Sequence, residues 1–167
     1  GVIAQMFYVG AQIMCWTYIY KYSENLSISS TKAANFQFIA FILFFVGRGI
    51  GTYLLRFIKA VKLIYISSVF ACFFTCGVIF INNEFGLYSL VIVSFFMSVM
   101  FPTIYGLSLE GLTPEESKLG AAGLVMAIVG GAIMPKIQGI IIDIGGNQVD
   151  DINIIGLTEI NFSFFLP

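Results

Sequence analysis

Residues 63–81 read LIYISSVFACFFTCGVIFI, an uncharged and mostly apolar segment of 19 residues. A helix needs roughly 20 residues to cross the hydrocarbon core of a bilayer, which is about 30 Å thick. Four more segments have the same character, and only Arg48 and Lys136 place a charge in their interiors. No soluble fold of this size would hide five such helices. We therefore predict membrane spans at residues 2–20, 33–55, 63–81, 85–109 and 118–142.

The composition agrees with a membrane protein and excludes several other classes. The chain is 59% hydrophobic and 10% charged, whereas an ordinary soluble domain has about 25% charged residues. Its net charge of −1 offers no basic surface to nucleic acid. The sequence contains no histidine, the commonest general base and metal ligand. Cys72 and Cys76 match no metal motif, and no nucleophile and base converge, so we predict neither a metal site nor an enzyme.

Both ends of the sequence indicate a part of a longer protein. Gly1 lies directly inside the first span, and residues 161–167 read as the first turns of a sixth span that begins near residue 160. The loops are short and polar, without an inserted soluble domain. We expect one all-α transmembrane bundle over residues 1–167, as an internal or C-terminal part of a larger, transporter-sized chain.

The basic residues predict the orientation, because short cytoplasmic loops are enriched in lysine and arginine. Five basic residues lie on the side of the loops that follow the second and fourth spans, and three lie on the other side. We therefore place residues 56–62 in the cytoplasm and residues 145–153 outside. The five are Arg48, Arg56, Lys59, Lys62 and Lys118, and the three are Lys21, Lys32 and Lys136.

Polar and aromatic side chains recur on one face of the first span. Gln5, Tyr8, Gln12 and Trp16 are three or four residues apart, which places them within about an 80° arc of a helix. Such a stripe faces protein or water, not lipid. Amides that bond hydroxyls and rings that stack on a pyranose favour a sugar cavity. An interhelical hydrogen-bond seam with an interfacial aromatic belt explains the stripe equally well.

The fourth span combines a proline with hydroxyl groups. Pro102 removes a backbone hydrogen bond in the middle of the membrane, which a helix tolerates where neighbours or water satisfy the freed carbonyl. A kinked, hydroxyl-lined gate is one interpretation. A structural kink, with serines that bond back to their own backbone, is the other. The side chains on the shared face are Ser94, Ser98, Phe101, Tyr105 and Ser108, while Thr103 points the opposite way.

The fifth span is rich in small residues. Thr113 as N-cap, Pro114 and Glu116 predict a helix start with a capping box. Small residues let helix backbones approach closely, and this packing drives association in lipid. We therefore expect mainly a structural role for Gly120, Gly123, Gly130, Gly131 and Gly139.

No carboxylate lies deep in any predicted span. The acidic residues, among them Glu84, Asp143 and Glu159, all fall in loops or at helix ends. A proton-coupled carrier needs a buried acid whose pKa is raised by loss of hydration. If the chain is part of such a carrier, we expect that acid in the missing part of the protein.

With these residues in view, the chain resembles the C-terminal half of a major facilitator superfamily carrier, in the fucose permease family of sugar:proton symporters. Residues 4–12 (AQMFYVGAQ), with Trp16, resemble the family's seventh helix. Residues 101–105 (FPTIY) resemble helix ten and residues 125–132 (VMAIVGGA) resemble helix eleven. Between helices eight and nine, the family's basic cytoplasmic motif is matched by Gly47, Arg48, Gly51 and Arg56.

The resemblance implies twelve helices in two pseudo-symmetric halves that rock about a midplane site in the bacterial inner membrane. It implies a hexose or deoxyhexose of the fucose, glucose or galactose type, carried inward with a proton and without a cofactor. The protonatable carboxylates of the family lie in the N-terminal half. A carrier of the same fold for another solute such as a drug, or a sodium-coupled sugar carrier, is the alternative.

The resemblance also assigns candidate residues. The sugar-binding candidates are Gln5, Tyr8, Gln12, Trp16, Phe101 and Tyr105, together with Asn35, which matches an asparagine of helix eight by position. The gating candidates are Gly47, Arg48, Gly51, Arg56, Pro102, Gly130 and Gly131. The expected partners are the sugar, the lipid bilayer and the N-terminal half, with no nucleic acid.

Overall fold

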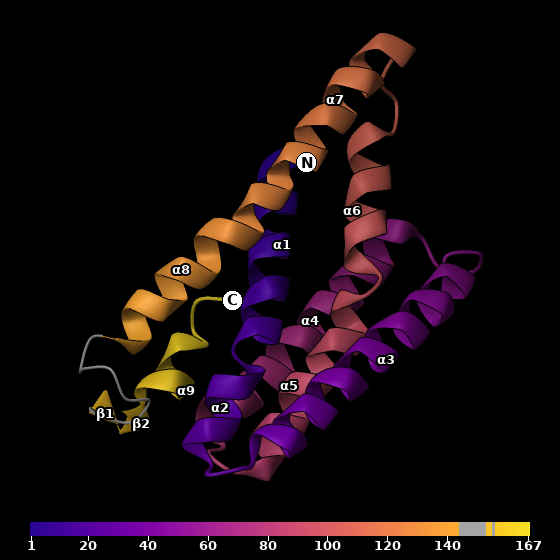
Figure 1. Ribbon diagram of the computed structural model, residues 1–167. Helices are drawn as coiled ribbons and strands as arrows, with labels where there is room; N and C mark the ends of the chain where they lie inside the picture. The colour runs from indigo at the N-terminus through magenta and orange to yellow at the C-terminus, as the bar shows by residue number, and fades with distance from the viewer. Residues whose placement is uncertain (144–152, 155) are drawn as a thin grey trace.

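A computed structural model describes residues 1–143, 153–154 and 156–167 of the chain (Figure 1). These residues are almost all helical, apart from a short antiparallel hairpin in which Asn153 pairs with Thr158. The elements are α1 (Val2–Thr17), α2 (Ile19–Asn25), α3 (Ser30–Leu54), α4 (Ala60–Phe80), α5 (Glu84–Met97), α6 (Met100–Leu109), α7 (Pro114–Met126), the 3₁₀ turn η1 (Ala127–Val129), α8 (Gly130–Ile142), β1 (Asn153–Ile154), β2 (Leu157–Thr158) and α9 (Glu159–Ser163).

Four helical segments are long and apolar enough to cross a membrane. They are α3, α4, α5 with α6, and α7 with η1 and α8, and they are 25, 21, 26 and 29 residues long. The pair α1 and α2 makes a fifth, with a bend of 41° between its two helices. The helix α9 lies where the sequence predicts the beginning of a sixth span. The prediction of an all-α transmembrane bundle is confirmed.

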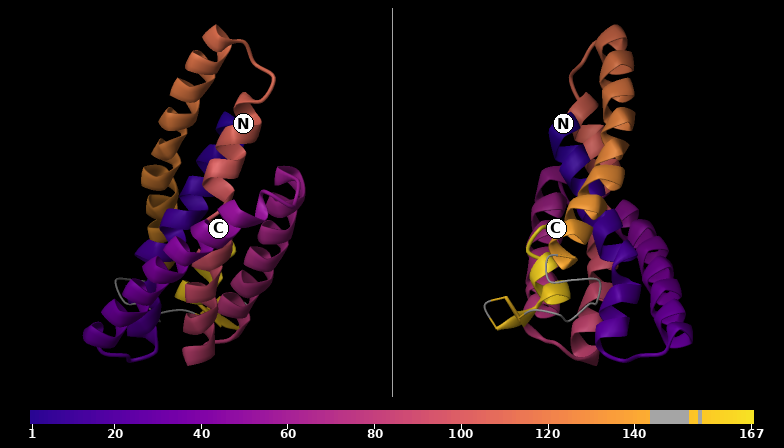
Figure 2. Two further views of the ribbon diagram at one scale, coloured as in Figure 1. Left: turned by 90° about the vertical axis from the view of Figure 1, so that its right-hand side faces the viewer. Right: turned by 60° about the vertical axis from the view of Figure 1, so that its left-hand side comes forward.

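The helices form an up-and-down bundle with tight connections (Figures 1 and 2). The N-terminus and the α6–α7 connection lie toward one end, and the α2–α3 and α4–α5 connections lie at the other (Figure 1). Both α3 and α4 pack along α5, while α8 packs along α1. The first half of α1 therefore stands between the α5–α6 span and the long α7–α8 span.

The buried core lies where α1 and α2 meet α5. Met14, Ile19 and Tyr22 from the first pair, with Leu87 and Leu90 from α5, are all at most 2% exposed. Lipid tails are as apolar as these side chains, so their close contact stabilises the bundle mainly through dispersion and exclusion of lipid rather than through the hydrophobic effect.

The outside of the bundle is covered by large apolar side chains. Phe45 is 80% exposed and Leu119 is 79% exposed, and Phe38, Phe73 and Phe85 are exposed in the same way. A soluble monomer does not carry apolar area on this scale. These surfaces must therefore contact lipid or further protein.

Small residues bring α8 into close contact with α1, as the sequence predicts. A Cβ atom at Gly130 would overlap the carbonyl oxygen of Met6, and one at Gly131 would lie 3.0 Å from Cγ1 of Ile13. On the α1 side, a Cβ at Gly10 would lie 2.5 Å from Cγ of Met134. Backbone approach of this kind is possible only where one surface lacks a side chain.

The start of α7 has the predicted capping box. The Thr113 backbone N–H donates to Oε2 of Glu116 at 3.0 Å, and the Glu116 N–H donates to Oγ1 of Thr113 at 3.4 Å. Pro114 occupies the first helical position, where no backbone donor is needed. The helix thus begins with its free N–H groups partly satisfied.

Candidate functional site

The aromatic members of the α1 stripe point to the α5–α6 span and make specific hydrogen bonds there. The Tyr8 hydroxyl donates to the Met97 carbonyl oxygen at 2.6 Å. The indole Nε1 of Trp16 donates to Oγ of Ser94 at 3.1 Å. The Trp16 ring also packs edge-on against Phe41 and Phe44 of α3, with ring centres 5.0 Å apart in each pair. These contacts form an interhelical seam, and contact with a sugar stays a prediction for both rings.

The two glutamines of the stripe are buried inside this half. Gln5 has no exposed surface, and neither its amide nitrogen nor its amide oxygen has a hydrogen-bond partner among the described residues. Gln12 is 8% exposed. A buried amide without partners is costly. The Gln5 amide is therefore the least satisfied polar group of the stripe.

The α5–α6 span is interrupted between Met97 and Met100, three residues before Pro102. Since proline has no N–H, Pro102 leaves the Ser98 carbonyl without its usual helical donor. That carbonyl accepts a hydrogen bond from Nε of Arg48 at 3.4 Å. The Tyr8 hydroxyl serves the preceding carbonyl, that of Met97. Neighbouring helices thus satisfy two consecutive carbonyls at the break.

Hydroxyl groups of the same span bond back to their own helix. Ser98 Oγ donates to the Phe95 carbonyl at 2.6 Å, and Ser108 Oγ donates to the Ile104 carbonyl at 2.7 Å. Thr103 is buried and its Oγ1 donates to the Val99 carbonyl at 2.6 Å. These bonds correspond to the structural-kink interpretation of the serines. A gate at this position stays a prediction.

Close packing also holds α3 against the α5–α6 span at its break. A Cβ atom at Gly47 would lie 2.5 Å from Oγ of Ser98, and one at Gly51 would lie 2.5 Å from Cγ2 of Val99. Arg48, between them, lies over the Phe44 ring at 5.3 Å from its centre. Gly47, Arg48 and Gly51 thus meet the α5–α6 break. Arg56 lies beyond the end of α3 and is exposed.

Phe101 and Tyr105 follow the break and are half-buried. The ring centre of Phe101 is 6.3 Å from that of Tyr8, with an angle of 57° between the rings. The structure therefore brings Tyr8, Phe101 and Pro102 together at the α5–α6 break, as a common sugar-binding site would require. The sequence alone did not indicate that Tyr8 bonds the break directly.

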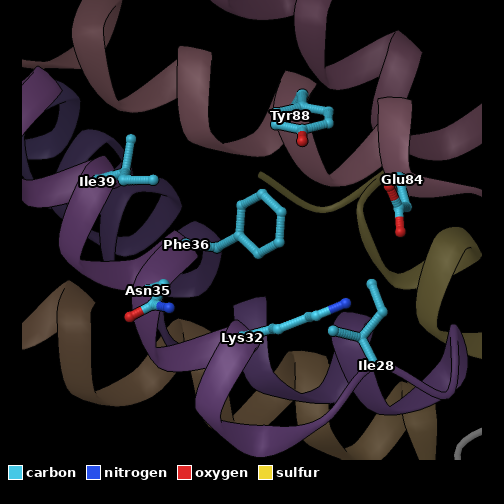
Figure 3. A pocket seen from close by; sticks show the side chains of 7 residues that line it. All are labelled: Ile28, Lys32, Asn35, Phe36, Ile39, Glu84 and Tyr88. Atoms are coloured by element: carbon cyan, nitrogen blue, oxygen red, sulfur yellow. The ribbon is translucent and has the colours of Figure 1, made fainter.

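Asn35 lies apart from this group, in a pocket between the starts of α3 and α5 (Figure 3). The pocket has a volume of about 310 Å³. The rings of Phe36 and Tyr88 meet edge to face across it at 5.3 Å, and Lys32 and Glu84 also line it (Figure 3). Asn35 is exposed. If Asn35 binds sugar, it therefore does so at the end of the bundle that we predict to face outward, away from the polar stripe of α1.

One acidic residue is more deeply buried than its place in the sequence suggests. Glu159, at the start of α9, has no exposed surface, and neither carboxylate oxygen has a partner among the described residues. Nearby in the fold, Gln138 of α8 donates from Nε2 to Oγ of Ser163 at 3.0 Å. The Asn161 amide ties α9 to the Val78 carbonyl of α4 at 2.9 Å. The apolar residues after Glu159 were the only sequence signal of this burial.

The described residues contain no group of three histidine, cysteine or acidic side chains that would hold a metal ion. Cys72 and Cys76 are both exposed on α4, while Cys15 is buried in α1. Asp150 and Asp151 lie outside the described residues, as does most of the predicted external segment 145–153.

Comparison with known proteins gives several relatives but no matching family model. The chain is 51% identical over all 167 residues to an L-fucose-proton symporter of Haemophilus influenzae and covers 37% of that protein. It is 34% identical over 149 residues, or 88% of its length, to an L-fucose-proton symporter of Escherichia coli, and covers 34% of it. It is 32% identical over 146 residues, or 86% of its length, to a glucose/galactose transporter of Brucella abortus, and covers 35% of it. The chain thus spans little more than a third of these relatives, which are transporters, not enzymes.

The fold agrees with a solved structure of the same kind. A crystal structure of a major facilitator superfamily transporter, FucP, in the outward conformation matches 99% of this chain with a TM-score of 0.83 at 31% identity, and the chain covers 39% of it. Together with the apolar helices, the bacterial relatives identify an integral protein of the inner membrane. The chain belongs to the major facilitator superfamily, in the fucose permease family, and forms the C-terminal part of such a protein.

Proposed function

We propose that this chain is the C-terminal half of a sugar:proton symporter that carries a hexose or deoxyhexose inward by alternating access. The observation that carries the proposal is 51% identity, over the whole chain, with a protein named L-fucose-proton symporter. L-Fucose is therefore the first substrate to test. The sugar, the lipid bilayer and an N-terminal half of the same protein are the partners that the proposal requires.

The proposed sugar-facing wall combines aromatic rings with an amide. Trp16, Phe101 and Tyr105 are half-buried within this half and so keep surface for a ligand. Gln12, one turn before Trp16, is the amide that would bond sugar hydroxyls. Gln5 and Tyr8 complete the wall from behind, because both are buried. Asn35, in its separate outer pocket, would contact the sugar at entry.

Most of the proposed gating residues occur at two close helix contacts. Gly47, Arg48 and Gly51 hold α3 against the α5–α6 break beside Pro102, while Gly130 and Gly131 hold α8 against α1. At each contact a glycine lies directly against the neighbouring helix, so a larger side chain would not fit there without a shift. We therefore propose that these helices rock as one unit, with Arg56 at the cytoplasmic end of α3.

The coupling site belongs to the other half in this proposal. A proton carrier needs a desolvated acid. The interiors of the predicted spans contain no carboxylate, and the buried Glu159 lies at the start of α9. Hexoses of the glucose and galactose type are the second candidate substrates, because a relative at 32% identity is named a glucose/galactose transporter. Sodium coupling, or another small solute such as a drug, is the remaining alternative.

The full-length protein in lipid vesicles tests the proposal directly. We expect an inward proton gradient to drive uptake of labelled L-fucose, and we expect a protonophore to abolish it. Vesicles without protein give the background. Uptake that depends on a sodium gradient and not on a proton gradient would show that sodium is the coupling ion. Failure to take up L-fucose, glucose or galactose under either gradient would refute the sugar assignment.

A further inference from the structure

We infer that Tyr8 is a positioning residue, whose hydroxyl fixes the break in the α5–α6 span and thereby places Phe101 and Tyr105 for the sugar. The inference rests on the proposed function for the sugar, while the contact itself is independent of it. It assigns the Tyr8 hydroxyl to the protein backbone, with the sugar contacts made by the rings that follow the break.

The break needs donors from outside its own helix. An α-helix satisfies each carbonyl with the N–H four residues later, and Pro102 removes the donor for Ser98. In the membrane no bulk water replaces it. Nε of Arg48 in α3 donates to this freed Ser98 carbonyl at 3.4 Å. The Tyr8 hydroxyl of α1 donates at 2.6 Å to the carbonyl of Met97, the last residue of α5, where the helix is interrupted.

Of these two donors, Tyr8 is the better placed to fix a geometry. Its side chain is only 6% exposed, its bond is the shorter one, and a phenol ring has just two rotatable bonds. Arg48 is exposed and reaches its carbonyl through a long, flexible stem. Tyr8 bonds the last residue of α5 and its ring lies beside that of Phe101 in α6, so one buried side chain meets both helical pieces at the break.

The two rings proposed to face the sugar lie immediately after the break. Phe101 is the second residue of α6 and Tyr105 lies one turn later. Their positions relative to α1 therefore depend on how α6 continues from α5. The Phe101 ring also touches Tyr8 directly, with ring centres 6.3 Å apart. Loss of the hydroxyl should loosen the break and shift both rings.

Tyr8→Phe in the full-length protein tests the inference, with Tyr18→Phe as the matched control. Tyr18 also donates from a tyrosine hydroxyl to a backbone carbonyl, that of Pro135 in α8, at 2.7 Å. Each substitution thus removes one oxygen atom and one interhelical bond. Amide hydrogen exchange over residues 97–105 measures the break without sugar, and calorimetry measures the affinity for L-fucose.

We expect Tyr8→Phe to speed exchange over residues 97–105 and to weaken sugar affinity about 2- to 12-fold, the equivalent of one hydrogen bond. Tyr18→Phe should do neither. Equal exchange in wild type and Tyr8→Phe, or equal changes in both variants, would overturn the positioning role. If even the wild type binds no sugar, the proposed function fails, while the exchange comparison still decides whether Tyr8 holds the break.

A second measurement uses the wild type alone, in case Tyr8→Phe does not fold. If the break positions sugar-facing rings, saturating L-fucose should slow exchange over residues 97–105 more than over residues 130–142. Binding detected by calorimetry without any such local slowing would overturn the inference.

Discussion

Gly130 in α8 lies so close to Met6 in α1 that a Cβ atom at Gly130 would overlap the Met6 carbonyl oxygen. A second atom, Cγ of Met6, would be 2.9 Å away. The helix carrying Gly130 therefore has no room for even the smallest side chain at this point. Because the obstacle is backbone, rotation of a side chain cannot relieve the overlap.

Gly130→Ala should lower the free energy of unfolding by about 1–3 kcal/mol, the usual cost of overpacking. Gly106→Ala is the control, because a Cβ at Gly106 meets nothing within 4 Å and alanine favours a helix by about 0.5–1 kcal/mol. Unfolding of both variants in detergent, measured by titration with a denaturing surfactant, checks the difference. Equal stability of the two would show that α8 does not approach α1 this closely.

Gln12→Ala separates a sugar-facing wall from an interhelical seam. If Gln12 bonds a sugar hydroxyl, its loss should weaken L-fucose affinity by about 2- to 12-fold with little change in melting temperature. Calorimetry beside a melting curve measures both. Trp16→Phe, which removes the Nε1 donor to Ser94, is the companion variant and should lower the melting temperature more. A reversed pattern, with stable affinity and lower melting in Gln12→Ala, would assign Gln12 to the seam.

The predicted orientation has its own test. Single cysteines at Ser29 and Asn82 should react from outside the cell with an impermeant thiol reagent, whereas a cysteine at Lys59 should not. The background protein needs Cys72 and Cys76 replaced, because both are exposed. If only the cysteine at Lys59 is labelled, the orientation predicted from the basic loops is wrong.

Glu159→Gln tests the assignment of coupling to the other half most strictly, because Glu159 is the one acidic residue without exposed surface among those that the structure describes. We expect proton-driven uptake to be mostly retained, since α9 lies at the end of the bundle and not in the interior of a span. Uptake in vesicles at matched expression checks this, with exposed Asp143→Asn as control. Loss of proton coupling in Glu159→Gln alone would place a coupling site in this half.

The class of fold follows from the sequence alone. Five apolar segments near 20 residues in length have only one stable solution in a bilayer, because each helix satisfies its own backbone. Sequence motifs also predict local structure correctly where all the interacting residues are close together in the chain. The capping box at Thr113 and Glu116 is an example, since both partners lie within one turn.

Which polar residues meet depends instead on how the helices pack. Periodicity placed Tyr8 and Trp16 on one face of α1, but left cavity and seam equally probable. The contact from Tyr8 to Met97 spans 89 positions, and no spacing within α1 indicates it. The burial of Glu159 depends on the packing of α9 against α4 and α8. Whether a segment forms a membrane helix depends on its own residues. The hydrogen-bond partner of a polar group in that helix depends on which other helices surround it.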